Sequence, residues 1–249
     1  MSGKRMKTTW TTALLAVLPI VGMSAAAAAD DAPPSLSPAQ IALFESDHLK
    51  GIEHPERLEY RYRRESTTTG SPDAAFSDRV DLDVRPREDG KKDVWVDFLS
   101  GNRHQPFPPL MGFRGNPVLM FFLEHDVDEM NRETGGAAVY FRNRIRQAFV
   151  DRAQMKQVEI PHDGTEVAAT EITLTPFKDD PNLAPFPGVA DKRYRFLISD
   201  AIPGSIYEID ATVPGNAGDP PRIKDSMIFD STQPCASGEG PCAAPSSAQ

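Results

Sequence analysis

The chain has 249 residues, of which 27 are basic and 36 acidic, so its formal net charge at pH 7 is −9. This acidic balance argues against nucleic acids and anionic lipid surfaces as partners, because phosphate contacts need clustered Lys and Arg. The length suits one large domain or two small ones, and no segment after the first 29 residues is long and apolar enough to cross a bilayer.

The first 29 residues have the order of a secretory signal peptide. Lys4, Arg5 and Lys7 precede a largely apolar stretch over residues 10–23, and small residues then lead up to Ala29. We expect cleavage after Ala29 and a mature protein in the periplasm. An uncleaved membrane anchor is the alternative, although the apolar stretch is short for a span.

Residues 30–40 are rich in proline and predict a linker, and residues 231–249 have the Ser, Ala, Pro and Gly content of a disordered tail. Residues 41–230 between them are then a single domain. The tail holds both cysteines, Cys235 and Cys242, and an oxidising compartment favours a disulfide between them. A thiol or metal site is the alternative, but the spacing is not C-x-x-C.

Alternation of apolar and polar residues dominates the domain and predicts about eight strands. Such strands form an antiparallel sheet with one apolar and one polar face. The dipeptide Asp89-Gly90 is a strong hairpin signal between two of the strands. The clearest alternation covers residues 58–62, 80–84, 94–98, 172–174, 194–198, 207–213 and 223–229.

Two helical segments interrupt this pattern. Asn116-Pro117 favours a helix start, apolar residues at helical spacing follow, and Gly135-Gly136 ends the first helix. A second helix is predicted over residues 138–149. The short glycine link predicts an antiparallel helix pair. The expected fold class is therefore α+β, a curved antiparallel sheet with a helical hairpin packed on its apolar face.

Apolar residues in and before the first helix are the candidates for ligand binding. Met120 and Phe121 lie outside the main apolar stripe of that helix, and the preceding loop adds Phe107, Met111 and Phe113. Two interpretations stay open for these five side chains. They fill a core between two layers, or they line an apolar cavity in which flexible Met and Phe side chains adapt to a ligand.

Asp126 lies inside the apolar stripe and therefore needs a partner, for which we predict Arg142 of the second helix. A catalytic acid is the alternative for Asp126. His125 and Glu129 have a spacing that can hold a metal, but a solvated acidic helix face explains them better. His48 is interpreted as part of a polar surface. We predict no metal and no cofactor.

The run from Asp97 to Ala148 carries a resemblance to a known group of sequences. It contains Asp-Phe-Leu-Ser-Gly-Asn-Arg-His-Gln-Pro-Phe-Pro-Pro, Gly-Phe-Arg-Gly-Asn-Pro-Val-Leu-Met and Tyr-Phe-Arg-Asn-Arg-Ile-Arg. This run resembles a family of uncharacterised exported bacterial proteins, which implies a periplasmic home and no known activity. The expected outline is also similar to the periplasmic lipoprotein-carrier fold, a curved antiparallel sheet closed by helices.

Three functions follow as hypotheses. The first is a non-catalytic periplasmic binding or carrier protein for an apolar or lipid-like ligand. The second is a protein-interaction factor of the cell envelope, with an envelope protein as partner and a helix face or sheet edge as its surface. The third is a hydrolase, although no G-x-S-x-G, H-E-x-x-H, Walker A or G-x-G-x-x-G motif is present.

Three structural observations would separate these hypotheses. An enclosed cavity favours the first, and a solid core with an exposed apolar patch favours the second. A cleft where histidines and acids converge favours the third.

Overall fold

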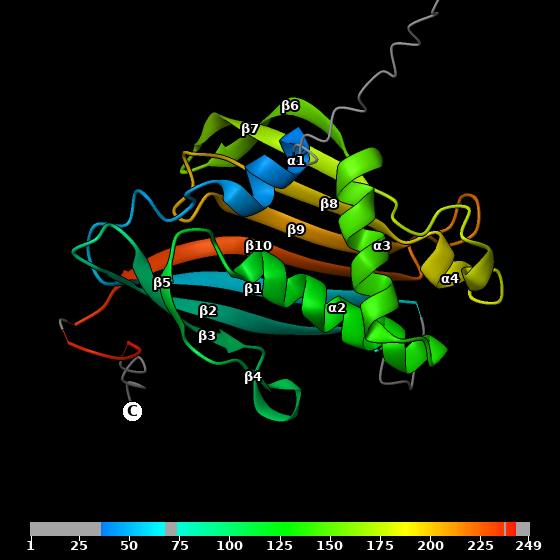
Figure 1. The fold of residues 1–249 in the computed structure, drawn as a ribbon, viewed down its shortest axis with the longest axis horizontal. Coiled ribbons are helices and arrows are strands. Elements are labelled where there is room, and N and C mark those ends of the chain that lie inside the picture. The colour runs from blue at the N-terminus through cyan, green and yellow to red at the C-terminus, as the bar shows by residue number, and fades with distance from the viewer. Residues whose placement is uncertain (1–35, 68–73, 237, 243–249) are drawn as a thin grey trace, which may run out of the picture. The chain divides into compact units, whose positions relative to one another are not determined.

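The computed structural model describes residues 36–67, 74–236 and 238–242 (Figure 1). The predicted signal peptide over residues 1–29, its cleavage site and the first part of the predicted linker lie outside the described residues. None of the described helices is long and apolar enough to cross a membrane.

One antiparallel sheet of ten strands is the framework of the fold, which confirms the predicted α+β class. Its strands run in the order β4-β3-β2-β1-β10-β9-β8-β7-β6, and β5 pairs with β3 beside β4. All seven segments with clear alternation are strands. The bounds are β1 (Glu56–Ser66), β2 (Phe76–Pro86), β3 (Lys92–Phe98), β4 (Gln105–Pro106), β5 (Leu110–Phe113), β6 (Gln154–His162), β7 (Thr165–Leu174), β8 (Arg193–Ile198), β9 (Ile206–Val213) and β10 (Ile223–Pro234).

The two faces of the sheet follow from the alternation. Leu58, Tyr60 and Tyr62 of β1 point to the inner face, where they are buried beneath the helices. The outer face carries the intervening charged residues, which pair across neighbouring strands. Examples are Arg57 with Asp83, Arg61 with Asp230 and Arg195 with Asp210. The core therefore lies between the inner face and the helices.

Helices α2 (Val118–Thr134) and α3 (Ala138–Asp151) cover the inner face. Gly135 ends α2 with a φ of 70°, as the predicted stop requires. The predicted antiparallel packing of these helices is wrong. Figure 1 shows α2 roughly along β1 and β2, while α3 crosses the strands steeply. The reason is local, because Ala137 is extended after the left-handed Gly135 and turns the chain through a corner.

Four short helical segments complete the fold, in addition to a single turn η2 (Gly101–Arg103). They are α1 (Pro38–Gln40), the π-helix η1 (Ile41–Glu45), η3 (Pro181–Leu183) and α4 (Pro187–Ala190). Residues 37–40 were expected to belong to a linker. Instead, Ser37 accepts a hydrogen bond from the backbone of Gln40, and the Gln40 side chain accepts one from the Ser37 backbone, so a capping box starts α1.

Asn116 joins the start of α2 to the sheet. Its side-chain oxygen accepts a hydrogen bond from the backbone N–H of Val118 at 3.1 Å. Its amide nitrogen donates to the Tyr60 hydroxyl and to the Gly204 carbonyl, both at 2.9 Å. Its backbone N–H donates to His48 Nδ1 at 3.2 Å. His48 is therefore a buried link between segments, which corrects its interpretation as surface.

Gly204 sits against this junction in a left-handed conformation, with a φ of +74°. A Cβ at this position would lie 2.6 Å from Leu58 Cδ1 and 2.8 Å from Asn116 Nδ2. Both the backbone conformation and the close approach therefore require glycine here.

The C-terminal segment is more ordered than the predicted tail. Residues 231–234 continue β10, and Cys235 and Cys242 form the predicted disulfide. The loop closed by this disulfide lies on the outer face of the sheet. Its Cys242 N–H donates to Asp83 at 2.8 Å, and Arg85 donates to two backbone carbonyls of the loop. These contacts order a loop that was expected to be part of a disordered tail. Residues 243–249 lie outside the described residues.

Candidate functional site

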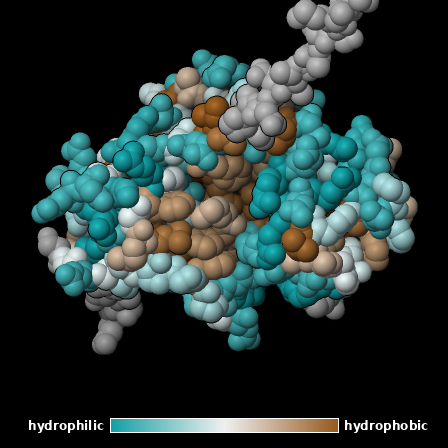
Figure 2. Space-filling model, in the orientation of Figure 1, coloured by the Kyte–Doolittle hydropathy of each residue, from teal (hydrophilic) through white to brown (hydrophobic). Residues whose placement is uncertain are grey.

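An open apolar groove lies where η1, α2 and α3 meet. Its volume is about 370 Å³. Figure 2 shows it as a brown, hollowed area in the middle of this face, bordered by teal side chains. We call it the helix groove. It is lined by Leu36, Gln40, Phe44, Glu45, Met120, Leu123, Glu124, Val127, Arg142, Ile145, Arg146 and Phe149.

The helix groove has a buried floor and exposed apolar walls. Val127, Ile145 and Phe149 are buried and form the floor. Phe44 stands edge-on to Phe149, with 5.0 Å between the ring centroids, yet it keeps 37% of its surface exposed. Met120 on the α2 wall is 41% exposed.

Three exposed large apolar side chains line this groove, Leu36, Phe44 and Met120. Eight such residues are found in the described part of the chain, and Ile41, Val139 and Val150 are three more of them, on η1 and α3 but outside the groove lining. Single exposed apolar residues need no explanation, but several in one groove make it a candidate binding surface.

The rim of the helix groove is charged. Arg142 of α3 donates from Nε to the Glu124 carboxylate of α2 at 2.8 Å, so an ion pair bridges two of the groove's walls. Glu45 lies on the η1 side and Arg146 on the α3 side. Within the described residues, neither Glu45 nor Arg146 forms an ion pair with another side chain.

The five predicted ligand-binding residues do not share one site. Met120 lines the helix groove. Phe107 and Phe121 stack on each other with 4.0 Å between centroids and fill the space beside α2. Met111 of β5 is exposed to solvent and Phe113 is half-buried. Binding by these side chains stays a prediction, and for Phe107 and Phe121 the structure shows the packing that the core interpretation describes.

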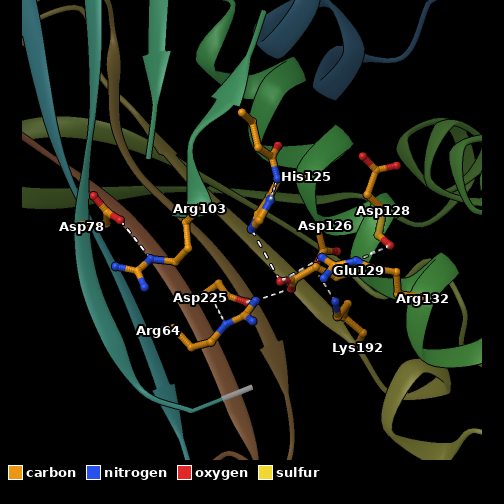
Figure 3. Close-up of polar contacts among 11 residues, drawn as sticks. Arg64, Asp78, Arg103, His125, Asp126, Asp128, Glu129, Arg132, Lys192 and Asp225 are labelled. Carbon is orange, nitrogen blue, oxygen red and sulfur yellow. Dashed lines mark hydrogen bonds and ion pairs between the residues drawn. The ribbon is translucent and has the colours of Figure 1, made fainter. Parts of the chain in front are cut away.

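A second site, which is polar, lies on the other side of α2, between this helix and the sheet (Figure 3). We call it the inner polar cluster. Figure 3 shows side chains from α2 pointing towards others from β1, β10 and the segment before β8. Its members are Arg64, His125, Asp126, Glu129, Lys192, Tyr194 and Asp225.

Asp126 is at the centre of this cluster, and its predicted pairing with Arg142 is wrong. Its two carboxylate oxygens accept hydrogen bonds from Lys192 Nζ and from the Tyr194 hydroxyl. The reason is direction, because Asp126 points from α2 to the sheet, whereas Arg142 pairs with Glu124 at the groove rim. The need for a buried partner was correctly predicted, and the partner comes from elsewhere in the chain.

The protonation states of this group follow from burial and charge. Burial alone would lower the pKa of Lys192, but the charge and hydrogen bond of Asp126 outweigh it and raise that pKa. Burial, followed by the Asp126 charge, holds the pKa of Tyr194 well above its ordinary value. Lys192 is therefore a cation and Tyr194 a neutral donor at physiological pH.

Arg64 and Asp225 form the second ion pair of the cluster. They are register partners on the adjacent strands β1 and β10. Arg64 binds Asp225 through Nε and NH2, each at 2.7 Å, and also donates to Glu129 of α2. The bidentate pair fixes the Asp225 carboxylate, and the bond from Arg64 to Glu129 ties α2 to the sheet.

His125 completes the cluster as a neutral ring. The Gln105 amide lies 2.6 Å from Nδ1, and donation from it leaves the proton on Nε2. Nε2 is 3.6 Å from the Glu129 carboxylate without a hydrogen bond. Burial lowers the pKa of His125, although Glu129 acts in the opposite direction. The predicted solvated acidic face is therefore wrong for His125, which is buried beside the rings of Tyr62 and Phe98.

The inner polar cluster is built as a set of ion pairs. The ligand atoms of Asp126, Glu129 and Asp225 lie within 4.8 Å of one another, a spacing that could hold a metal ion. Lys192 and Arg64 already place cationic groups against these carboxylates. These carboxylates are therefore neutralised by Lys192 and Arg64 and do not need a metal ion. The ion pairs hold α2 on the sheet.

Comparisons with known proteins assign this chain to no family. No protein-family model matches the sequence, and no curated protein sequence matches it. A similar solved chain belongs to a structure titled "The complex structure of Pseudomonas aeruginosa MucA/MucB". It shares 12% sequence identity with a TM-score of 0.31, and the match covers 77% of this chain and 56% of that chain. The expected membership of a family of exported bacterial proteins stays an expectation.

Proposed function

We propose that this protein is a protein-interaction factor of the cell envelope that binds an apolar segment of a partner protein in the helix groove. One observation carries this proposal. The groove is an apolar surface with exposed Phe44 and Met120, and it lies above a filled core. Apolar surface that stays exposed in this way marks a binding site in a soluble domain.

A carrier of small apolar ligands is less well supported. Ligand pockets bury most of their ligand's surface in a cleft or cavity. The space beside α2 that could have served as a cavity is filled by the stacked rings of Phe107 and Phe121. The helix groove is a surface groove and not an enclosed cavity, which suits side chains presented by a protein better than a ligand to be enclosed.

A hydrolase is also less well supported by the two buried histidines. His48 uses both ring nitrogens, one at 2.8 Å from the Ala42 carbonyl and one accepting from the Asn116 backbone. The acids around His125 are neutralised by Arg64 and Lys192. Neither ring is therefore presented to a substrate as a general base.

We also propose that the protein is exported. The basic, apolar and small-residue order of residues 1–29 supports this, and so does the disulfide between Cys235 and Cys242. The groove would then face partners in the periplasm.

The proposed function can be tested with a displayed library of random peptides selected on the protein without its first 29 residues. Selected peptides should carry apolar anchors and bind the wild type. Phe44→Glu and Met120→Glu should each weaken them by about tenfold or more, equivalent to about 1.4 kcal/mol. Met155→Glu is the matched control, because Met155 is similarly exposed but lies on β6 outside the groove.

Two results would contradict the proposal. One is a set of peptides that bind all four proteins equally, which would place binding outside the groove. The other is a fluorescent lipid analogue that binds the wild type tightly, does not bind Met120→Glu, and displaces every selected peptide. That pattern would return the carrier hypothesis to first place.

A further inference from the structure

The two long helices that line the helix groove offer few free backbone hydrogen-bonding groups. Six lining residues lie inside α2 or α3, away from the helix ends: Leu123, Glu124, Val127, Arg142, Ile145 and Arg146. Their N–H and C=O groups bond within their own helix, so these two walls present mainly side chains. An extended peptide in the groove would leave its own backbone groups facing an apolar floor, which is costly. A helical segment satisfies its backbone internally and avoids this cost.

The charges on the rim constrain the flanks of such a helix. Glu45 on the η1 side and Arg146 on the α3 side have opposite charge and lie on different walls. Among the described residues, neither has an ion-pair partner, whereas Glu124 and Arg142 neutralise each other. A fatty acyl chain has a polar group at one end only, so it cannot use two opposite charges on two walls. An amphipathic helix can, with a charged flank on each side of its apolar stripe.

We infer that the partner of the helix groove is an amphipathic helix with a basic flank and an acidic flank on either side of its apolar stripe. This inference rests on the proposed function. The basic flank faces Glu45 and the acidic flank faces Arg146. Because reversing a helix exchanges its flanks, the two charges also fix the direction in which the helix lies.

Three synthetic helical peptides with the same apolar stripe test this inference. One has a Lys flank and a Glu flank, the second has two Lys flanks, and the third has two Glu flanks. The wild type should bind the mixed peptide best, by about three- to tenfold at low salt, because two exposed ion pairs act together. Raising the salt concentration should shrink the difference.

Charge reversal on the protein should change the order of the peptides. Arg146→Glu leaves two acidic walls, so the peptide with two Lys flanks should become the best ligand. Glu45→Arg should favour the peptide with two Glu flanks in the same way. The double variant should bind the mixed peptide again, now in the reverse direction, which a spin label at the peptide's N-terminus would report. Arg193→Glu is the control, because Arg193 is exposed on β8 and does not line the groove.

The outcomes separate this inference from the proposed function. Equal binding of all three peptides, still weakened by Met120→Glu, would overturn the charged-flank partner while the groove remained a binding site. No binding of any helical peptide, with extended peptides bound in a Met120-dependent way, would overturn the helical partner. Binding that Met120→Glu does not affect would overturn the proposed function itself.

Discussion

Lys192 and Asp126 form a buried ion pair across the interface between the sheet and α2, although 66 residues separate them in the chain. Asp126 lies on α2, whose opposite side forms a wall of the helix groove. The pair therefore anchors the helix that shapes the candidate binding surface. A second group on the sheet side also holds the Asp126 carboxylate, because the Tyr194 hydroxyl of β8 donates a hydrogen bond to it.

Removing one member of this pair should destabilise the fold strongly. Asp126→Ala leaves the Lys192 ammonium buried without its partner, so we expect a loss of about 3–5 kcal/mol in the free energy of unfolding. Urea denaturation measures this. Arg142→Ala is the control, because its pair with Glu124 is exposed and should contribute less than about 1 kcal/mol. Equal effects of the two variants would show that Asp126 is not buried as described.

Two neighbouring residues of α2 should respond differently to truncation. Phe121 is buried against Phe107, so Phe121→Ala should cost about 3–5 kcal/mol through lost contacts and a cavity. Met120 faces the groove, so Met120→Ala should change stability by less than about 1 kcal/mol while weakening peptide binding. Thermal or urea unfolding and a binding assay on the same preparations give both numbers. A stable Phe121→Ala variant with lost binding would instead support a ligand role for Phe121.

Acid should destabilise the protein through its two buried histidines. Burial lowers the pKa of His125 and of His48 below the ordinary value of 6.5. The unfolded chain therefore takes up these protons at a higher pH than the folded protein does. The stability that the neutral rings provide is complete above about pH 6.5 and is lost as the pH falls through the lower folded pKa values.

Urea midpoints measured from about pH 7.5 down to about pH 5 should show this loss. His125→Gln should reduce the dependence on pH, whereas His54→Gln should not, because His54 is exposed. A midpoint in the wild type that does not change over this range would contradict the buried, neutral histidines.

Removing the disulfide should have a modest and local effect. The sequence separation of 7 between Cys235 and Cys242 closes a short loop, for which chain entropy gives about 2.5 kcal/mol or less. The Cys235→Ser, Cys242→Ser double variant should therefore remain folded. Hydrogen exchange should increase at the backbone amide of position 242, which donates to Asp83 in the wild type, and should stay unchanged in β7 and β8. Global unfolding of the variant would contradict this account.

The N-terminus of exported protein should lie at or near Asp30. The order of charges and apolar residues before this position predicts cleavage after Ala29. Expression in a bacterial host, recovery of the periplasmic fraction and N-terminal sequencing check this directly. Recovery of membrane-bound protein with Met1 intact would instead show an anchor.

Local signals predicted much of the fold. Asp89-Gly90 forms the expected hairpin turn, in which Gly90 has a φ of 78°. Gly135 ends α2 for the same conformational reason. Strand β6 was missed because it is an edge strand, mostly exposed, with few apolar residues to show alternation. The short helical segments α1 and η1 were not predicted. The prolines before them indicated a linker, and the capping signal of Ser37 and Gln40 was overlooked.

The candidate site could be predicted only in part. The apolar excess around Met120 left a core and a ligand cavity open as interpretations, and the structure places Met120 on the wall of the helix groove. The contribution of Phe44 depends on how η1 packs against α3, which no local pattern encodes. The partners of Asp126 were not predictable from helix geometry either, because Lys192 and Tyr194 reach it through the pairing of distant strands.

The contact between Gly204 and Asn116 has an evolutionary consequence. A side chain at position 204 would collide with the Asn116 amide, and the Gly204 carbonyl accepts a hydrogen bond from that amide. We therefore expect any side chain at position 204 to disturb the Asn116 hydrogen bonds as well. Where descendants of a common ancestor have exchanged Asn116, we expect the first turn of α2 to begin with a different capping residue, while glycine stays at 204 because the φ of +74° and the approach of Leu58 still require it.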